Sequence, residues 1–273
     1  MDARQVRIPH LKDKKRRQEK IAVLTAYDAA MARLFDRAGL DAVLVGDSVG
    51  MTALGYKTTL PVTLDMMVHH TAAVCRGVER ALVIADMPFL TYQVSAAEAV
   101  RNAGRLIQEG GAAAVKLEGG KPVLDVVRRL VEVGIPVMGH LGLLPQSVHQ
   151  LGGYRKRGVV REEADIILED AAALEEAGAF AIVLESIPAD LARTITATLS
   201  IPTIGIGAGP ECDGQVLVSY DMLGLLDDGV PSFVKRYGRL AETILAATEA
   251  YIDDVRSGRF PEVPSPAAGT AAR

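Results

Sequence analysis

Five runs of apolar residues in this sequence end in side chains that can carry charge, donate a proton or bind a metal. The residues at these ends are Asp47 and Ser48, Asp86, Lys116 and Glu118, His140, and Glu185. A parallel strand covered on both faces reads as an unbroken apolar run. Proteins of the α/β class keep their chemistry at the carboxyl ends of such strands. We therefore expect these side chains to come together at one end of a sheet or barrel.

Three of these side chains are carboxylates, those of Asp47, Asp86 and Glu118. Ionised carboxylates that lie close together repel one another and raise one another's pKa, and a bound cation removes this problem. Oxygen ligands favour Mg²⁺, Mn²⁺ or Ca²⁺ over Zn²⁺, so the sequence predicts a site for a hard divalent cation. The alternative is that each acid only caps the helix that follows its strand.

Lys116 and Glu118 flank Leu117, so on a strand their side chains face the same side. Burying both charges is costly unless they pair or take part in the chemistry. Lys116 would neutralise a substrate carboxylate or the charge that develops on an enolate oxygen. The alternative is a purely structural ion pair.

Three other polar side chains have distinct candidate roles. Glu185 is the best candidate for a general acid or base, because nothing near it in the sequence suggests a further metal ligand. Alternatively, it caps the helix expected to begin near Pro188. His140 either bonds a carboxylate or a metal-bound group, or is a structural histidine. Ser48 has no paired base, so it suits a hydrogen-bond donor better than a nucleophile.

A divalent cation, a lysine and a separate base together suit carbonyl chemistry. The cation would chelate the carboxylate and ketone of a 2-oxo acid and acidify the adjacent C–H bond. The base would remove that proton, and the enolate would then attack an electrophile.

The elements that must position these residues alternate between strands and helices. We expect strands near 21–27, 42–47, 81–86, 113–118, 136–140, 181–185, 202–209 and 215–223. We expect helices at 28–40, 63–77, 95–109, 123–133, 163–178, 189–199 and 233–255, a loop over 140–147 and a glycine-hinged mobile lid over 151–158. This order predicts an α/β fold with a parallel sheet, either a closed (β/α)8 barrel or a doubly wound open sheet.

Composition narrows the class of protein. The 273 residues suit one domain, placed at 1–260 with an N-terminal helical extension, and the Pro- and Ala-rich tail at 261–273 is expected to be disordered. The net charge of −4 does not favour nucleic-acid binding, and no apolar run is long enough to span a membrane. Two cysteines without metal-ligand spacing, and no signal peptide, favour the cytoplasm. The basic run at 12–20 is expected to be a solvated helix.

Six short motifs occur in order between about Thr25 and Phe260. They are Val45–Met51, Thr59–Thr63, Ala85–Phe89, Val115–Gly120, Gly139–Ser147 and Ile204–Gly209. As an ordered set they strongly resemble the ketopantoate hydroxymethyltransferase family. The resemblance implies a (β/α)8 TIM barrel of the phosphoenolpyruvate/pyruvate-like superfamily. It also implies transfer of a hydroxymethyl group from 5,10-methylenetetrahydrofolate to 3-methyl-2-oxobutanoate, which gives 2-dehydropantoate for pantothenate biosynthesis.

The same resemblance implies roles for individual residues. It implies Asp47, Asp86 and Glu118 as the ligands of Mg²⁺. It implies Asp47, Ser48, Asp86 and Lys116 as contacts to the oxo acid. Glu185 is implied as the proton acceptor, and the folate site is not assigned to any residue. The resemblance further implies a homodecamer made of two pentameric rings.

Two other functions fit parts of this pattern. A metal-dependent carbon–carbon lyase or phosphonomutase on a related barrel would act on an oxo acid without folate. A non-catalytic metabolite-binding protein would keep the barrel alone, although the presence of both Asp86 and Glu118 argues against it.

Overall fold

A computed structural model of the chain describes residues 5–226 and 229–262. Its strands are β1 (Ile21–Thr25), β2 (Ala42–Val45), β3 (Leu82–Asp86), β4 (Ala114–Glu118), β5 (Val137–Gly142), β6 (Ala181–Glu185), β7 (Thr203–Ile206) and β8 (Gly214–Leu217). Each strand pairs in parallel with the next, and β8 pairs with β1, so the strands form a closed barrel. The predicted (β/α)8 barrel is confirmed, and the open-sheet alternative is wrong. From residue 263 onward, the tail that we expected to be disordered lies outside the described residues.

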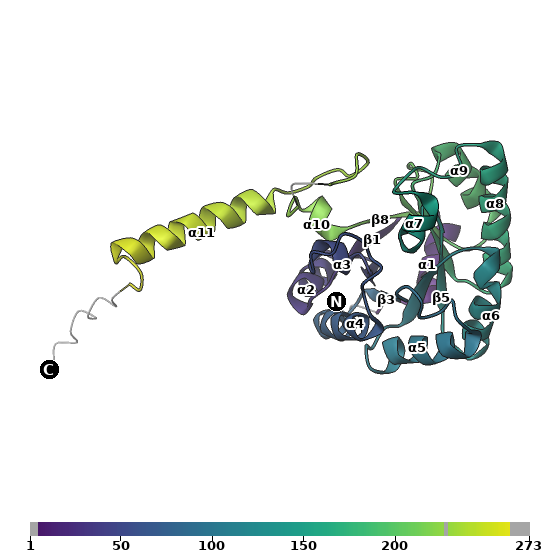
Figure 1. The fold of residues 1–273 in the computed structure, drawn as a ribbon, viewed down its shortest axis with the longest axis horizontal. Helices are drawn as coiled ribbons and strands as arrows, with labels where there is room; N and C mark the ends of the chain where they lie inside the picture. The colour runs from purple at the N-terminus through teal and green to yellow at the C-terminus, as the bar shows by residue number, and fades with distance from the viewer. Residues whose placement is uncertain (1–4, 227–228, 263–273) are drawn as a thin grey trace. The chain divides into compact units, whose positions relative to one another are not determined.

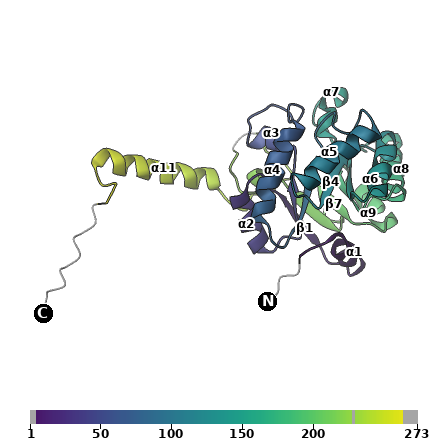
Figure 2. The ribbon, with the colours of Figure 1, turned by 90° about the horizontal axis from the view of Figure 1, so that it is seen from below.

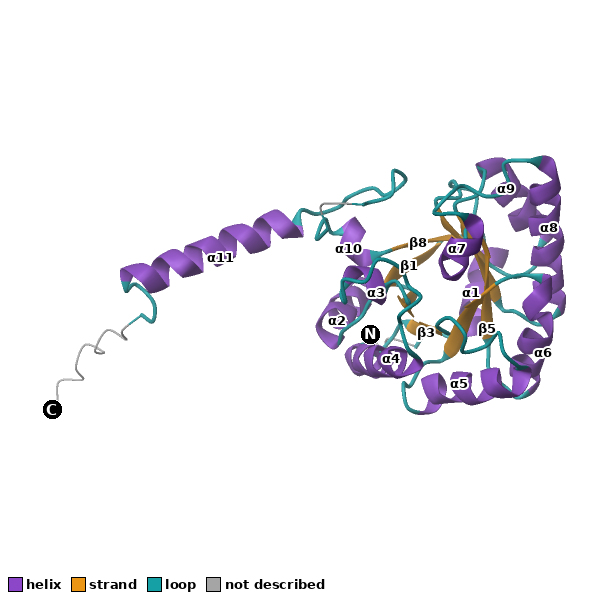
Figure 3. Cartoon of the chain, in the orientation of Figure 1, coloured by secondary structure: helices purple, strands orange, loops and turns teal. Residues whose placement is uncertain are grey.

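Helices separate most of the strands along the chain. The helices up to β8 are α1 (Ile8–Arg16), α2 (Ala29–Ala38), α3 (Val49–Thr52), α4 (Leu64–Gly77), α5 (Ala96–Gln108), α6 (Leu124–Glu132), α7 (Val148–Leu151), α8 (Arg161–Glu176) and α9 (Ala189–Thr198), with 3₁₀ turns η1 (Lys121–Val123) and η2 (Pro145–Ser147). Helices α2, α4, α5, α6, α8 and α9 lie around the outside of the strands (Figures 1 and 3). The region predicted as a loop over 140–147 instead continues β5 to Gly142 and then forms η2.

Capping side chains fix where several of these helices begin. The Asp28 carboxylate accepts hydrogen bonds from the backbone N–H groups of Ala30 and Met31 at the start of α2. Thr63 and Ser95 cap α4 and α5 in the same way. These contacts satisfy N–H groups that have no partner within the helix. They confirm the predicted starts near residues 28, 63 and 95.

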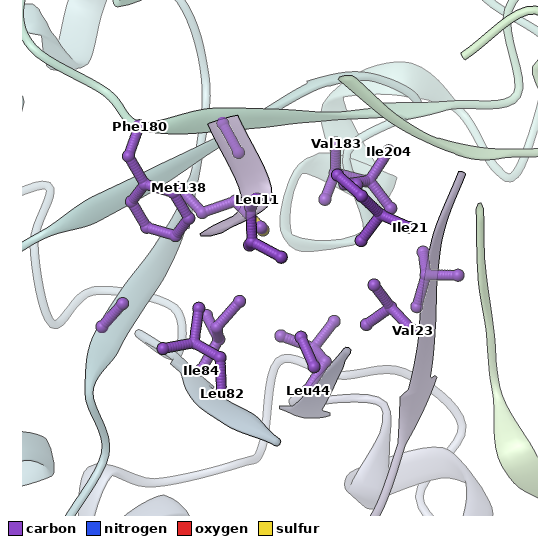
Figure 4. Packing of buried hydrophobic residues seen from close by; sticks show 14 of the residues in the cluster. Leu11, Ile21, Val23, Leu44, Leu82, Ile84, Met138, Phe180, Val183 and Ile204 are labelled. Atoms are coloured by element: carbon purple, nitrogen blue, oxygen red, sulfur yellow. The ribbon is translucent and has the colours of Figure 1, made fainter. Parts of the chain in front are cut away.

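The inside of the barrel is filled by alternate side chains of the strands. The cluster includes Ile21, Val23, Leu44, Leu82, Ile84, Met138, Phe180, Val183 and Ile204, which point toward one another (Figure 4). Because strand residues two apart face the same side, one residue in two of each strand contributes to this core. Leu11 of α1 is only 1% exposed and joins the same cluster. The barrel is therefore a packed core, and α1 helps to cover the end opposite α3 and α7 (Figure 2).

Ion pairs attach α1 to the barrel. Lys14 Nζ lies 2.7 Å from Asp41 Oδ1, and Lys15 Nζ lies 2.8 Å from Asp213 Oδ2. The basic run at 12–20 is helical as far as Arg16 and is mostly exposed, as predicted. The prediction of a solvated face fails at Lys14 and Lys15, because both pair with acids of the barrel.

The described chain divides into two compact units, Met1–Ser219 and Tyr220–Arg273. Helix α10 (Ser219–Met222) spans this boundary in the sequence, and the second unit contains α11 (Leu240–Ser257), which has no buried residue. Helix α11 begins seven residues later than predicted, because the preceding backbone pairs with residues 222–224 instead: Tyr237 N–H donates to Met222 O, and Leu240 N–H to Leu223 O. No helix in the described part of the chain has the length and apolarity that a membrane span needs. The single domain at 1–260 stays a prediction.

Replacing Leu11 by Ala should lower the free energy of unfolding by about 2–5 kcal/mol, because it removes buried apolar contacts and leaves a cavity at the end of the barrel. Urea unfolding followed by circular dichroism measures this change. Leu34 of α2 is 57% exposed, so Leu34→Ala is the matched control and should change stability by no more than about 0.5 kcal/mol. Equal losses of unfolding free energy in both variants would contradict the role of Leu11 in closing the end of the barrel.

Candidate active site at the carboxyl end of the barrel

The inward-facing positions of β3 and β4 change from apolar to charged toward the carboxyl end. Ile84 belongs to the interior cluster, and Asp86 is the next inward position on β3. On β4, Ala114 belongs to the cluster, and Lys116 and Glu118 follow it on the same face of the strand. The alternation that fills the core therefore also delivers three charged side chains to the mouth of the barrel.

The same alternation continues on the next two strands. Met138 on β5 is followed inward by His140, and Val183 on β6 by Glu185. Strand β5 ends at Gly142, whose φ of +96° suits glycine, and an added Cβ there would lie 2.2 Å from the carbonyl oxygen of Glu185. This close approach brings the ends of β5 and β6 together.

Asp47, Asp86 and Lys116 form one buried group. Lys116 Nζ lies 3.0 Å from Asp86 Oδ1, and the backbone N–H of Asp47 donates to Asp86 Oδ2 over 3.0 Å. All three side chains are buried. The predicted shared face of Lys116 and Glu118 is confirmed, because both side chains approach Nδ1 of His140, but the ion pair of Lys116 is with Asp86.

His140 connects this group to Glu118 and Glu185. Its Nδ1 lies 3.3 Å from Lys116 Nζ and 3.6 Å from Glu118 Oε1, and its Nε2 lies 3.1 Å from Glu185 Oε2. Glu185 is the most exposed of these residues, with 18% of its side chain accessible against 3% for His140. The next residue, Ser186, has a left-handed φ of 48°, which turns the chain sharply after the strand. Glu185 thus stands at the open side of the group.

Burial and like charges govern the electrostatics of the site. Burial, followed by the charges of Asp86 and Glu118, raises the pKa of Asp47 to about 8. Burial also raises the pKa of Asp86, although the Lys116 ammonium opposes this. Burial alone would lower the pKa of Lys116, but the surrounding carboxylates raise it above its usual value. The ionised forms of the two aspartates are therefore only partly compensated by the groups around them.

Burial and the Lys116 ammonium each lower the pKa of His140. The carboxylates of Glu118 and Glu185 outweigh both effects and raise it to about 9. This shift favours the protonated imidazole, which lies between the two carboxylates.

The three carboxylates have the donor chemistry of a hard divalent cation site. Asp86 Oδ1 is buried and has no hydrogen bond, although Lys116 Nζ is within ion-pair distance. The raised pKa of Asp47 marks a position where a further positive charge would be stabilising. Among the described residues, no three His, Cys, Asp or Glu side chains stand in ready-made coordination geometry. The residues nevertheless fit Mg²⁺ by ligand type and charge.

None of the candidate acids caps a helix. The N-cap positions of α3 and α9 are Ser48 and Pro188, and neither the Asp47 nor the Glu185 side chain caps the helix that follows it. Asp86 is followed by a loop as far as Ser95, and the N-cap of η1 is Gly120. The capping alternative is therefore wrong for these acids.

Ser48 follows Asp47 and is partly buried. Its Oγ lies 2.8 Å from the hydroxyl of Tyr27, a residue that ends the first βα connection. This contact is between two hydroxyl groups, so it does not supply the base that a serine nucleophile needs.

Gln146 and Tyr92 are site residues that sequence reasoning missed. The backbone N–H of Gln146 donates to Glu118 Oε2 over 3.0 Å, and its side-chain Nε2 donates to Asp47 Oδ2 over 2.9 Å. The Tyr92 hydroxyl lies 2.8 Å from Gln146 Oε1. Gln146 lies in η2 and Tyr92 in the loop after β3. Neither follows an apolar run directly, and only the position of Gln146 inside the motif Gly139–Ser147 pointed to it.

The predicted lid at 151–158 contacts two elements at the carboxyl end of the barrel. The Tyr154 hydroxyl contacts Met51 Sδ of α3 at 3.5 Å, and the backbone N–H of Arg157 donates to Ser186 O over 2.9 Å. Partial burial, followed by the charges of Asp47, Glu185 and Glu118, raises the pKa of Tyr154. The segment thus contacts both α3 and the residue that follows β6; its mobility stays a prediction.

Known proteins of similar sequence include several that carry the same name. A sequence model described as ketopantoate hydroxymethyltransferase matches residues 5–263. The 3-methyl-2-oxobutanoate hydroxymethyltransferase of Moorella thermoacetica is 61% identical over 257 residues, which cover 94% of this chain and 96% of that protein. The protein of the same name from Cyanothece sp. is 59% identical, with coverage of 94% and 98%.

Solved structures of more distant proteins share the fold. Phosphonopyruvate hydrolase in complex with oxalate and Mg²⁺ has a TM-score of 0.61 at 14% identity, covering 94% of this chain and 89% of that one. A 2,3-dimethylmalate lyase of the PEP mutase/isocitrate lyase superfamily has a TM-score of 0.60 at 18% identity, covering 96% and 91%. These neighbours support the barrel architecture. At such low identity they show a shared fold and nothing about function.

Adding Mg²⁺ should raise the melting temperature of the chain, because an ion that binds only the folded state stabilises it. At a hundredfold excess over Kd, the gain is about 2.7 kcal/mol. Differential scanning fluorimetry measures the shift. Asp86→Asn should abolish it, whereas Asp165→Asn, an exposed acid on α8, should leave it unchanged. A full shift in the Asp86 variant would remove this carboxylate from the cation site.

Proposed function

Because this chain belongs to the ketopantoate hydroxymethyltransferase family, we propose that it transfers a hydroxymethyl group to 3-methyl-2-oxobutanoate. The observation that carries this proposal is the 61% identity to the Moorella thermoacetica enzyme across nearly the whole of both chains. The family predicted from the motifs is confirmed by the sequence match over residues 5–263. The lyase or phosphonomutase alternative finds support only in structures 14–18% identical, which share the fold. A non-catalytic binding protein fits less well, because the relatives bear an enzyme's name.

We propose 5,10-methylenetetrahydrofolate as the one-carbon donor and 2-dehydropantoate as the product, in pantothenate biosynthesis. Asp47, Asp86 and Glu118 would hold Mg²⁺ at the mouth of the barrel. When bound, the ion would polarise the oxo group of the substrate and so acidify the neighbouring C–H bond. Each of these carboxylates is buried among polar partners. Little reorganisation of the surrounding protein would then be needed during the reaction.

Lys116 and Ser48 would bind the oxygen atoms of the oxo acid, together with Asp47 and Asp86. The carboxylates around Lys116 raise its pKa, so its ammonium stays charged at neutral pH. A fixed, buried positive charge stabilises negative charge that develops on an oxo oxygen more strongly than water does. The Ser48 hydroxyl, held by Tyr27, would donate a weaker and more directional hydrogen bond.

Glu185 would take the proton from C3 of the oxo acid. Its carboxylate is the most accessible of the group, and His140 Nε2 lies 3.1 Å from one of its oxygens. This is ion-pair distance, so a protonated imidazole would hold the Glu185 carboxylate at the mouth of the barrel. His140 is therefore a positioning residue behind the base, and a base held in place removes a proton faster than a mobile one.

We also propose that the enzyme works in the cytoplasm as a homodecamer of two pentameric rings, as the family resemblance implies. Cys75 and Cys212 are both free thiols, which suits a reducing compartment. Light scattering coupled to size-exclusion chromatography tests the assembly, with an expected mass ten times that of the 29.0 kDa chain.

Product should form only when 5,10-methylenetetrahydrofolate accompanies Mg²⁺ and 3-methyl-2-oxobutanoate, because the oxo acid alone contains no one-carbon electrophile. Mass spectrometry of the product, with and without the folate, measures this dependence. Cleavage or rearrangement of an oxo acid without folate would favour the lyase or phosphonomutase instead.

Glu185→Gln should slow exchange of the C3 proton for deuterium by at least about 100-fold, because the amide cannot accept that proton. Proton NMR of the oxo acid in D₂O with Mg²⁺ measures the exchange without folate. Glu176→Gln, at an exposed position of α8, is the matched control and should exchange at the normal rate. Calorimetry should show nearly unchanged binding of the oxo acid. Normal exchange in the Glu185 variant would exclude this residue as the base.

A further inference from the structure

We infer that Gln146 is a positioning residue that fixes which oxygen atoms of Asp47 and Glu118 face the divalent cation. The inference rests on the proposed function, because it assumes that these carboxylates bind Mg²⁺. Gln146 is buried and makes hydrogen bonds through its backbone N–H, its side-chain NH₂ and its side-chain oxygen. Its role follows from the direction of those bonds.

The partners of the Gln146 amide allow it only one orientation. Nε2 lies 3.0 Å from the carbonyl oxygen of Met87 and 2.9 Å from Asp47 Oδ2. A backbone carbonyl can only accept hydrogen bonds, so the NH₂ group must face this side. On the other side, Oε1 accepts from the Gln93 amide over 3.2 Å and from the Tyr92 hydroxyl over 2.8 Å. A flipped amide would lose bonds on both sides.

Tyr92 sets the direction of the remaining bonds. The backbone N–H of Glu118 donates to the Tyr92 hydroxyl over 3.1 Å, and that hydroxyl donates to Gln146 Oε1. The backbone N–H of Gln146 in turn donates to Glu118 Oε2 over 3.0 Å. This closed cycle of three buried residues locks Gln146 against β4. An amide held in this way cannot rotate away from Asp47 without breaking several bonds.

The result is that each of the three carboxylates has one oxygen bonded to an uncharged donor. Gln146 bonds Asp47 Oδ2 and Glu118 Oε2, and the backbone N–H of Asp47 bonds Asp86 Oδ2. The remaining oxygens of Asp86 and Glu118 face the charged groups of the site: Asp86 Oδ1 lies 3.0 Å from Lys116 Nζ, and Glu118 Oε1 lies 3.6 Å from His140 Nδ1. These oxygens would be the ones that turn to the cation. Gln146 orients Asp47 and Glu118 without adding to the positive charge that Lys116 and His140 already place beside the site.

The test uses the full chain and Mn²⁺ alone as a probe, without either substrate. Gln146→Met keeps the length of the side chain but removes its amide, and it should weaken Mn²⁺ binding by about 10- to 100-fold, as loss of a group that orients metal ligands typically does. Isothermal titration calorimetry measures Kd, and electron paramagnetic resonance reports the symmetry around the bound ion. Tyr92→Phe removes the hydroxyl that fixes the amide, so it should weaken binding by a smaller factor. Gln150→Met, at an exposed position of α7, is the matched control and should leave Kd unchanged.

The outcomes separate this inference from the proposed function. If the natural chain binds Mn²⁺ and both site variants bind it equally tightly with the same spectrum, the role of Gln146 is wrong and the proposed function stands. If the natural chain binds no Mn²⁺, both fail together. A role limited to stability would lower the melting temperature of Gln146→Met but leave the spectrum of the bound ion unchanged, and that result also overturns the inference. If Gln146→Met does not fold, Tyr92→Phe decides, because it keeps the ring and removes only the hydroxyl.

Discussion

The burial of like charges at one end of the barrel is the constraint on which the rest of this structure depends. Asp47, Asp86 and Glu118 are buried with Lys116 as the ammonium among them. Burial of carboxylates in such numbers is unfavourable unless each finds donors or a cation. Three features supply these donors. They are the hydrogen bonds from Gln146 in η2, the ion pair between Lys116 on β4 and Asp86 on β3, and the imidazole of His140 on β5. The apolar layers below them then hold the strands that carry these groups.

The period of two residues in the strands explains why much of the site was predictable from sequence. Asp86, Lys116 and Glu118 share the inward parity of apolar core residues, so a strand assignment alone places them on one face. Closure of the barrel was not predictable in this way, because it depends on pairing between β1 and β8, which lie about 190 residues apart. Local patterns describe each strand but not which strand lies beside it.

Other features depend on contacts that leave no periodic signal. Gln146 is a neutral side chain in a 3₁₀ turn, and its importance comes from partners on β2, β3 and β4 connections rather than from its own neighbours. The late start of α11 has a similar origin, because backbone pairing with Met222 and Leu223 competes with helix formation before Leu240. In both cases a tertiary contact overrides local sequence preference. The roles of the individual site residues rest on chemistry and family resemblance together.

The closure of one end of the barrel by Leu11 of α1 determines where small molecules can enter. Since the far end of the barrel is packed with apolar side chains, small molecules can reach the buried charged residues from the carboxyl end of the strands, where Glu185 is accessible. Under the proposed function, an oxo acid and a folate would both have to use this one opening.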